Sequence, residues 1–132
     1  MEQQVVELFG TLSIGASGAV SAFYGGGISN IVKETAAGQY SITLDAKYYK
    51  FLGFDYNLVD DGISQISAIQ ILEDPATFQA DVMADSTFKI QLLAPTSSSV
   101  TTSIAANAAD GAQVMFRITV RNTSINYNGS ST

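Results

Sequence analysis

The clearest pattern in the sequence is an alternation of apolar and polar side chains with a period of two. It is strictest in the segments 40–44, 54–58, 88–92 and 114–121. In the last of these, Val114, Phe116, Ile118 and Val120 alternate with Met115, Arg117, Thr119 and Arg121. Successive side chains of a β-strand point to opposite faces of its sheet. Each segment therefore predicts a strand with one face in a core and the other toward solvent.

Weaker strand patterns occur elsewhere, and turn signals separate them. The weaker candidates are 5–14, 19–24, 28–34, 63–72 and 77–84. Glycine-rich or Asp-Gly and Asp-Pro turns recur at intervals typical of a β-sandwich or an antiparallel barrel. We therefore predict an all-β fold: a single antiparallel β-sandwich or barrel-like domain of about eight or nine strands. A hairpin should close between Lys33 and Gln39, and Asp45–Phe51 should form one helical turn.

Three parts of the chain depart from the strand pattern and suggest its organisation. Residues 1–24 precede the glycine run Gly25–Gly27, and we expect them to form an extended N-terminal arm or the first strands. Residues 25–125 form the predicted β-sandwich domain. Within it, the Ser-, Thr- and Ala-rich segment Ala94–Ala109 predicts a long loop with one short strand. Residues 126–132 are expected to be a polar C-terminal tail.

The composition excludes most catalytic chemistries. The 132 residues contain no cysteine, histidine or tryptophan. A disulfide, a Cys/His zinc site and a serine or cysteine nucleophile activated by histidine are therefore all excluded. We expect a protein that is not an enzyme and has no cofactor.

The charge balance bears on partners. Six basic residues stand against twelve acidic ones, for a net charge of −6. Nucleic acids and anionic membrane surfaces attract clustered basic residues, whereas the basic residues here are scattered, so we expect neither as a partner. The first residues lack the basic and apolar regions of a signal peptide, so we expect synthesis in the cytoplasm. The scattered basic residues are Lys33, Lys47, Lys50, Lys89, Arg117 and Arg121.

Four motifs could carry chemistry, but each has a simpler interpretation. Asp60–Gly62, near Asp55, offers carboxylates for calcium but lacks the EF-hand spacing. Glu73–Pro75 is acidic, yet the aromatic platform common in sugar sites has no tryptophan to build it. Gly25–Gly27 lacks the Lys-Ser/Thr pair of a phosphate loop. The hydroxyls of 96–103 have no histidine to activate them. Turns and loops explain these motifs, so we predict no catalytic and no metal site.

Low charge and exposed aromatics point instead to an interface. Charged residues make up 14% of the chain, about half the usual share, so little charge opposes association. Aromatic side chains carry much of the energy of protein interfaces, although filling the core is the alternative role. Two arginines on one strand face suit a neighbour's carboxylates or an internal ion pair. The candidate interface residues are Phe9, Phe23, Tyr24, Tyr48, Tyr49, Arg117 and Arg121.

Three segments carry a resemblance to a known family. They are Gly26–Asp45, with its strand, turn glycine and alternating strand; Asp45–Leu52, an aromatic link; and Ile104–Ile125, which ends in Val-Arg-Asn-Thr-Ser-Ile. From Gly27 to Ile125 the chain resembles short virion structural proteins of tailed bacteriophages, some of which are head decoration (cement) proteins.

The resemblance implies a structural role without a catalytic site. It implies binding to the outside of the capsid, with the major capsid protein and further copies of the chain, as dimers or trimers, for partners. The implied location is the virion exterior after synthesis in the host cytoplasm. Similar β-domains occur in tail fibres and baseplates, so a domain that binds a receptor or another tail protein is the alternative.

Overall fold

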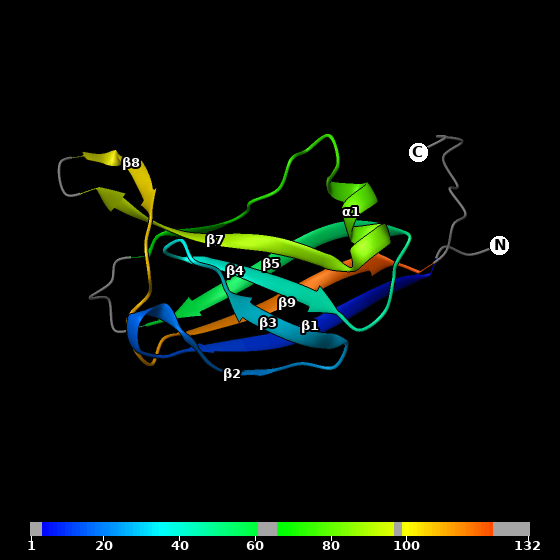
Figure 1. The fold of residues 1–132 in the computed structure, drawn as a ribbon, viewed down its shortest axis with the longest axis horizontal. Helices are drawn as coiled ribbons and strands as arrows, with labels where there is room; N and C mark the ends of the chain where they lie inside the picture. The colour runs from blue at the N-terminus through cyan, green and yellow to red at the C-terminus, as the bar shows by residue number, and fades with distance from the viewer. Residues whose placement is uncertain (1–3, 61–65, 97–98, 123–132) are drawn as a thin grey trace.

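The computed structural model describes residues 4–60, 66–96 and 99–122 and shows two facing antiparallel β-sheets (Figure 1). This arrangement confirms the predicted all-β sandwich. A short 3-10 turn and one helix interrupt the strands. The elements are β1 (Val5–Ile14), η1 (Ala16–Gly18), β2 (Val20–Tyr24), β3 (Ile28–Lys33), β4 (Gln39–Leu44), β5 (Lys50–Val59), β6 (Ala68–Ile71), α1 (Phe78–Asp85), β7 (Thr87–Thr96), β8 (Ser99–Ala105) and β9 (Gln113–Arg121).

The first sheet has the strand order β2-β1-β9-β5, and the second has the order β3-β4-β7-β6 with β8 paired to β7. All pairs are antiparallel. The first and last strands of the domain, β1 and β9, lie side by side in the middle of the first sheet. This sheet is therefore complete only once β9, the last described strand, has been synthesised.

The alternation in the sequence explains where the core lies. In β9 the even-numbered side chains Val114, Phe116, Ile118 and Val120 are at most 4% exposed, while the side chains of Met115, Arg117 and Thr119 face outward. In β4 the residues Tyr40 and Ile42 are likewise fully buried. Side chains from both sheets meet in one core, to which Phe51, Phe54, Phe78, Phe88 and Phe116 contribute edge-on and stacked ring contacts.

The N-terminal segment forms the first strands and is not an extended arm over residues 5–24. β1 pairs with β9 along Val5–Ser13, and β2 pairs with the end of β1. Leu12 and Ile14 are at most 1% exposed. Apolar side chains buried this deeply hold the segment in the sandwich, because exposing each one would lose on the order of 2 kcal/mol.

The prediction of a strand over residues 77–84 is wrong, because the chain forms helix α1 there. Phe78 and Val82 fit a period of two but are also four residues apart, so both face one side of a helix. The carbonyl of Asp74 accepts hydrogen bonds from the N–H groups of Thr77 and Phe78, which starts the helix. Ser86, with a φ of 59°, ends it.

Two other local predictions are also corrected. Residues 45–49 form no helical turn: the N–H of Asp45 is bonded to Gly27, that of Tyr49 is bonded to Arg121, and strand β5 begins at Lys50. The segment 94–109, expected to be a long loop with one short strand, contains a strand, β8, but it also contains the end of β7, and the two strands form a hairpin. At both places backbone hydrogen bonds to other segments take the place of the expected local structure, since they satisfy main-chain donors and acceptors.

The hairpin predicted between Lys33 and Gln39 is confirmed by the pairing of β3 with β4. The strand expected within 63–72 is β6, and residues 63–65 lie outside the described residues, as do the turn residues Asp61 and Gly62 and the expected tail 126–132. In the part of the chain that the structure describes, no helix has the length and apolar character needed to cross a membrane.

Candidate functional site: the outer face of the first sheet

The outward face of the sheet β2-β1-β9-β5 carries three large apolar side chains that are well exposed. Phe9 of β1 is 63% exposed, Tyr24 of β2 is 67% exposed and Met115 of β9 is 42% exposed. We call these three residues the outer patch. Exposed aromatic and Met side chains gathered on one face are typical of contact surfaces.

Strand register explains why the three side chains lie close together. Thr11 of β1 is opposite both Tyr24 and Met115 in its two neighbouring strands. Phe9 is two residues along β1 from Thr11, so its side chain is on the same face. The pairing of three adjacent strands therefore brings the outer patch together.

Two shallow hollows flank the outer patch. One, of about 330 Å³, lies between Phe9 and Met115 and the polar side chains Asp55 and Asn57. The other, of about 320 Å³, lies on the Tyr24 side and is lined mostly by apolar surface. Side chains of a partner protein fit into depressions of this kind between exposed aromatic groups.

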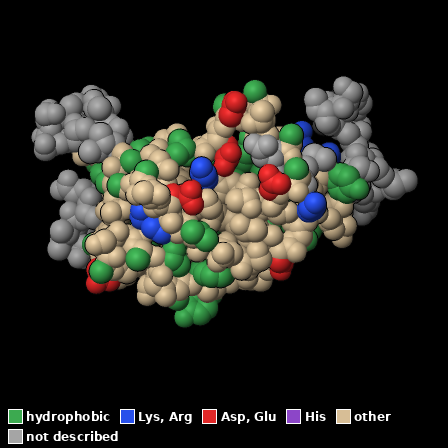
Figure 2. Space-filling model, in the orientation of Figure 1, with side chains coloured by type: hydrophobic (Ala, Val, Ile, Leu, Met, Phe, Trp, Pro, Cys, Tyr) green, Lys and Arg blue, Asp and Glu red, His purple; other side chains and the backbone are tan. Residues whose placement is uncertain are grey.

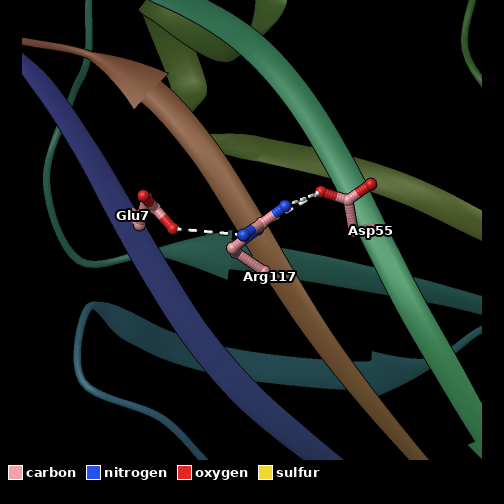
Figure 3. A network of polar contacts seen from close by, with 3 residues as sticks. All are labelled: Glu7, Asp55 and Arg117. Carbon is pink, nitrogen blue, oxygen red and sulfur yellow. Dashed lines mark hydrogen bonds and ion pairs between the residues drawn. The ribbon is translucent and has the colours of Figure 1, made fainter.

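A charged network borders the patch (Figure 3). The Nη2 of Arg117 is 2.6 Å from Oδ2 of Asp55 on β5, and its Nη1 is 3.4 Å from Oε2 of Glu7 on β1. The two carboxylates raise the pKa of Arg117, chiefly through the hydrogen bond to Asp55. This network is the internal ion pair that the sequence left as one of two roles for Arg117.

Arg121 lies at the end of the same face, in register with Lys50 of β5 and Val5 of β1. It is only 5% exposed, and its buried Nε has no hydrogen-bond partner. The three ion pairs among the described residues involve Lys89 and Arg117 as cations, and none of them includes Arg121 or Lys50. This end of the face is therefore cationic and lacks a described counter-charge.

The other predicted interface residues separate into two groups. Tyr49, just before β5, is 48% exposed and remains available for contacts. Phe23 and Tyr48 are half-buried and pack against the core, so the core-filling alternative applies to them. Burial and, to a lesser extent, Asp45 raise the pKa of Tyr48.

Three residues of this face were not among the interface candidates predicted from the sequence. Met115 is the apolar exception on the polar side of the β9 alternation, which is the signal that points to it. Glu7 and Asp55 join Arg117 only through the pairing of β1 and β5 with β9. No spacing in the sequence relates residues so far apart in the chain.

The comparisons with family models, with curated proteins and with solved structures found no match. Within the described ranges, no group of three acidic, cysteine or histidine side chains is placed to hold a metal ion. Charged side chains are also few and dispersed on the face seen in Figure 2. The outer patch and its border are the features of the described surface that best fit a function.

Proposed function

We propose that this chain is a structural protein of a tailed bacteriophage virion, which binds the outside of the capsid as a decoration protein and stabilises contacts between capsomers. The observation that carries the proposal is the outer patch of Phe9, Tyr24 and Met115 on a rigid sheet. The outer patch would bind a partner and would catalyse no reaction. The resemblance of residues 27–125 to virion structural proteins of tailed bacteriophages supports the phage virion as the place where the chain binds.

The energetics of the patch suit such a role. A protein repeated over a symmetric shell needs only modest affinity per contact, because linked contacts reinforce one another. Three exposed apolar side chains with two adjacent hollows offer modest affinity and a defined orientation. The major capsid protein and further copies of this chain are the proposed partners.

Immunogold electron microscopy of intact particles tests the proposal, with an antibody raised against this chain. Label spread evenly over the heads is the expected result. Label only on the tail tip or neck, or none on particles, would contradict a role on the capsid exterior. Particles that lack the gene for this chain serve as the control for antibody specificity.

One observation favours a second candidate, a tail-fibre or baseplate domain that binds a receptor or tail protein. The hairpin of β7 and β8 extends beyond the body of the sandwich (Figure 1). Projecting hairpins can reach into a partner's surface. Gold at the tail tip, together with loss of adsorption when residues 97–102 are replaced by a short Gly-Ser turn, would support this alternative.

A further inference from the structure

Strand β1 has an edge that no described strand occupies. β2 pairs with β1 only from Thr11 to Ile14, whereas β1 begins at Val5. Figure 1 shows β1 continuing past the place where β2 turns toward β3. The first half of β1 is therefore an open edge on the side away from β9.

The directions of the main-chain hydrogen bonds along β1 show which residues have their N–H and C=O groups pointing to this edge. Asn122 donates to the carbonyl of Gln4, and Ile14 donates to Ala112, so even-numbered residues of β1 bond toward β9. Gly15, an odd-numbered residue just after β1, bonds toward the β2 side. The N–H and C=O groups of Val5 and Glu7 therefore point to the open edge.

At two other edge strands of the sandwich, side chains occupy main-chain groups that a further strand could use. Gln79 of α1 hydrogen-bonds both the N–H and the C=O of Phe51 on β5. The hydroxyl of Tyr56 accepts the N–H of Ile69 on β6. Natural sheets avoid exposed pairing edges unless a strand is added there.

We infer that the open edge of β1 pairs with the same edge of a second copy, antiparallel about a two-fold axis at Val6. Val5 of each copy then lies opposite the other copy's Glu7, and these residues exchange main-chain hydrogen bonds. Val6 faces its own counterpart at the axis. The two first sheets become one continuous sheet.

Charge complementarity selects this partner and this register. Lys50, Arg121 and Val5 form one row across the sheet, and the second copy's Glu7 extends that row. The Cα atoms of that Glu7 and of Arg121 are about 10 Å apart. Arg121 is only 5% exposed, so the exposed Glu7 carboxylate covers most of this distance, and it does so while it remains beside Arg117 of its own copy. The cationic end that lacks a described counter-charge thereby receives one.

A register centred on Glu7 is disfavoured for two reasons. It would place the two Glu7 carboxylates opposite each other, which is destabilising. It would also bring Val5 of the second copy to Phe9, whose carbonyl oxygen lies beside Gly25. The edge there is already occupied.

Cysteine cross-linking tests the inference, because the natural chain has no cysteine. Across a non-hydrogen-bonded antiparallel pair the Cα atoms are about 4.5 Å apart, within the range of a disulfide. Mild oxidation should link Val6→Cys into dimers at concentrations where the control Val32→Cys, 45% exposed on β3, stays monomeric. Linkage of Glu7→Cys in place of Val6→Cys, or of neither, would overturn the proposed pairing.

Sedimentation equilibrium of Glu7→Gln gives a second test that does not rely on the half-buried Val6. The substitution keeps the size of an exposed side chain. In the proposed register it should weaken the dimer by about fivefold, because two symmetry-related contacts are lost that together account for about 1 kcal/mol. A strengthened dimer would indicate the Glu7-centred register, and an unchanged one would exclude the Glu7–Arg121 contact.

The inference specifies the self-association that belongs to the proposed function, and the two can fail separately. Gold on phage heads without cross-linking would keep the virion role and overturn the edge pairing. Cross-linked dimers without gold on particles would keep the pairing and overturn the virion role.

Discussion

The side-chain amide of Gln79 hydrogen-bonds both main-chain groups of Phe51, as a neighbouring strand would. Its Oε1 accepts the N–H of Phe51 at 2.9 Å, and its Nε2 donates to the C=O of Phe51 at 2.8 Å. Both main-chain groups of an edge residue are thereby satisfied by one side chain from helix α1. The helix both covers the core with Phe78 and protects the edge of β5.

Replacing Gln79 separates these two roles. Gln79→Ala should lower the free energy of unfolding by about 1–2 kcal/mol, since it removes two hydrogen bonds at a half-buried position. Gln79→Glu should cost more at neutral pH, because a carboxylate cannot donate to the Phe51 carbonyl. Protonation restores the donor, so the deficit of Gln79→Glu relative to the natural chain should shrink as the pH falls toward 4. Urea unfolding at several pH values measures both, and a pH-independent deficit would contradict this role of the amide.

Tyr40 should make the protein sensitive to alkali. Its ring is fully buried, its hydroxyl donates to the Gly18 carbonyl at 2.5 Å, and burial raises its pKa to about 12. An unfolded tyrosine has a pKa near 10, so above that pH the unfolded state loses its proton first. The stabilisation from Tyr40 is therefore complete below pH 10 and falls progressively up to about pH 12.

Tyr40→Phe is the matched variant for this effect. At neutral pH it should lose about 1–2 kcal/mol of stability, because the Gly18 carbonyl is left without its partner. Between pH 10 and 12 its stability should fall less steeply than that of the natural chain. Thermal unfolding monitored by circular dichroism across this range gives both slopes, and parallel slopes would show that another group causes the alkaline loss.

Gly38 should tolerate no side chain. Its φ is +72°, and a Cβ there would collide with the carbonyl oxygens of Ala106 and Leu92. We expect Gly38→Ala to cost about 2 kcal/mol or more, from backbone strain and steric overlap together. Gly53→Ala is the control, since a Cβ at Gly53 meets nothing within 4 Å and its φ is not positive. Equal melting temperatures for the two variants would show that the turn does not require glycine at position 38.

The outer patch should matter for binding and not for folding. Phe9→Ser removes an apolar side chain that is 63% exposed, so the melting temperature should stay nearly unchanged. If the proposed function is right, the variant should be largely lost from purified heads when it competes with the natural chain. Val32→Ser, an exposed position on the other sheet, should compete normally. Equal incorporation of both variants would remove the patch from the capsid contact.

The sequence predicted the strands well where alternation is strict, as in 40–44 and 114–121, because an unbroken period of two matches a strand and does not match a helix. It failed at α1, where Phe78 and Val82 satisfy both a strand and a helix period. Only the packing of both side chains against the core decides between the two. It also left residues 5–24 as either an arm or strands, since nothing local indicates that β1 would find β9 at the far end of the chain.

Some features of the candidate site also followed from the sequence, and others only from the tertiary structure. The sequence determined that histidine, cysteine and tryptophan chemistry is absent and that few charges cover the surface, because these follow from composition alone. It also marked Phe9, Tyr24 and Arg117 as candidates. Only the tertiary structure placed Met115 beside them, joined Glu7 and Asp55 to Arg117, and left the β2-side edge of the first half of β1 without a described partner strand. These relations depend on strand register between distant segments, which is set by the burial of whole faces and not by any neighbouring residue.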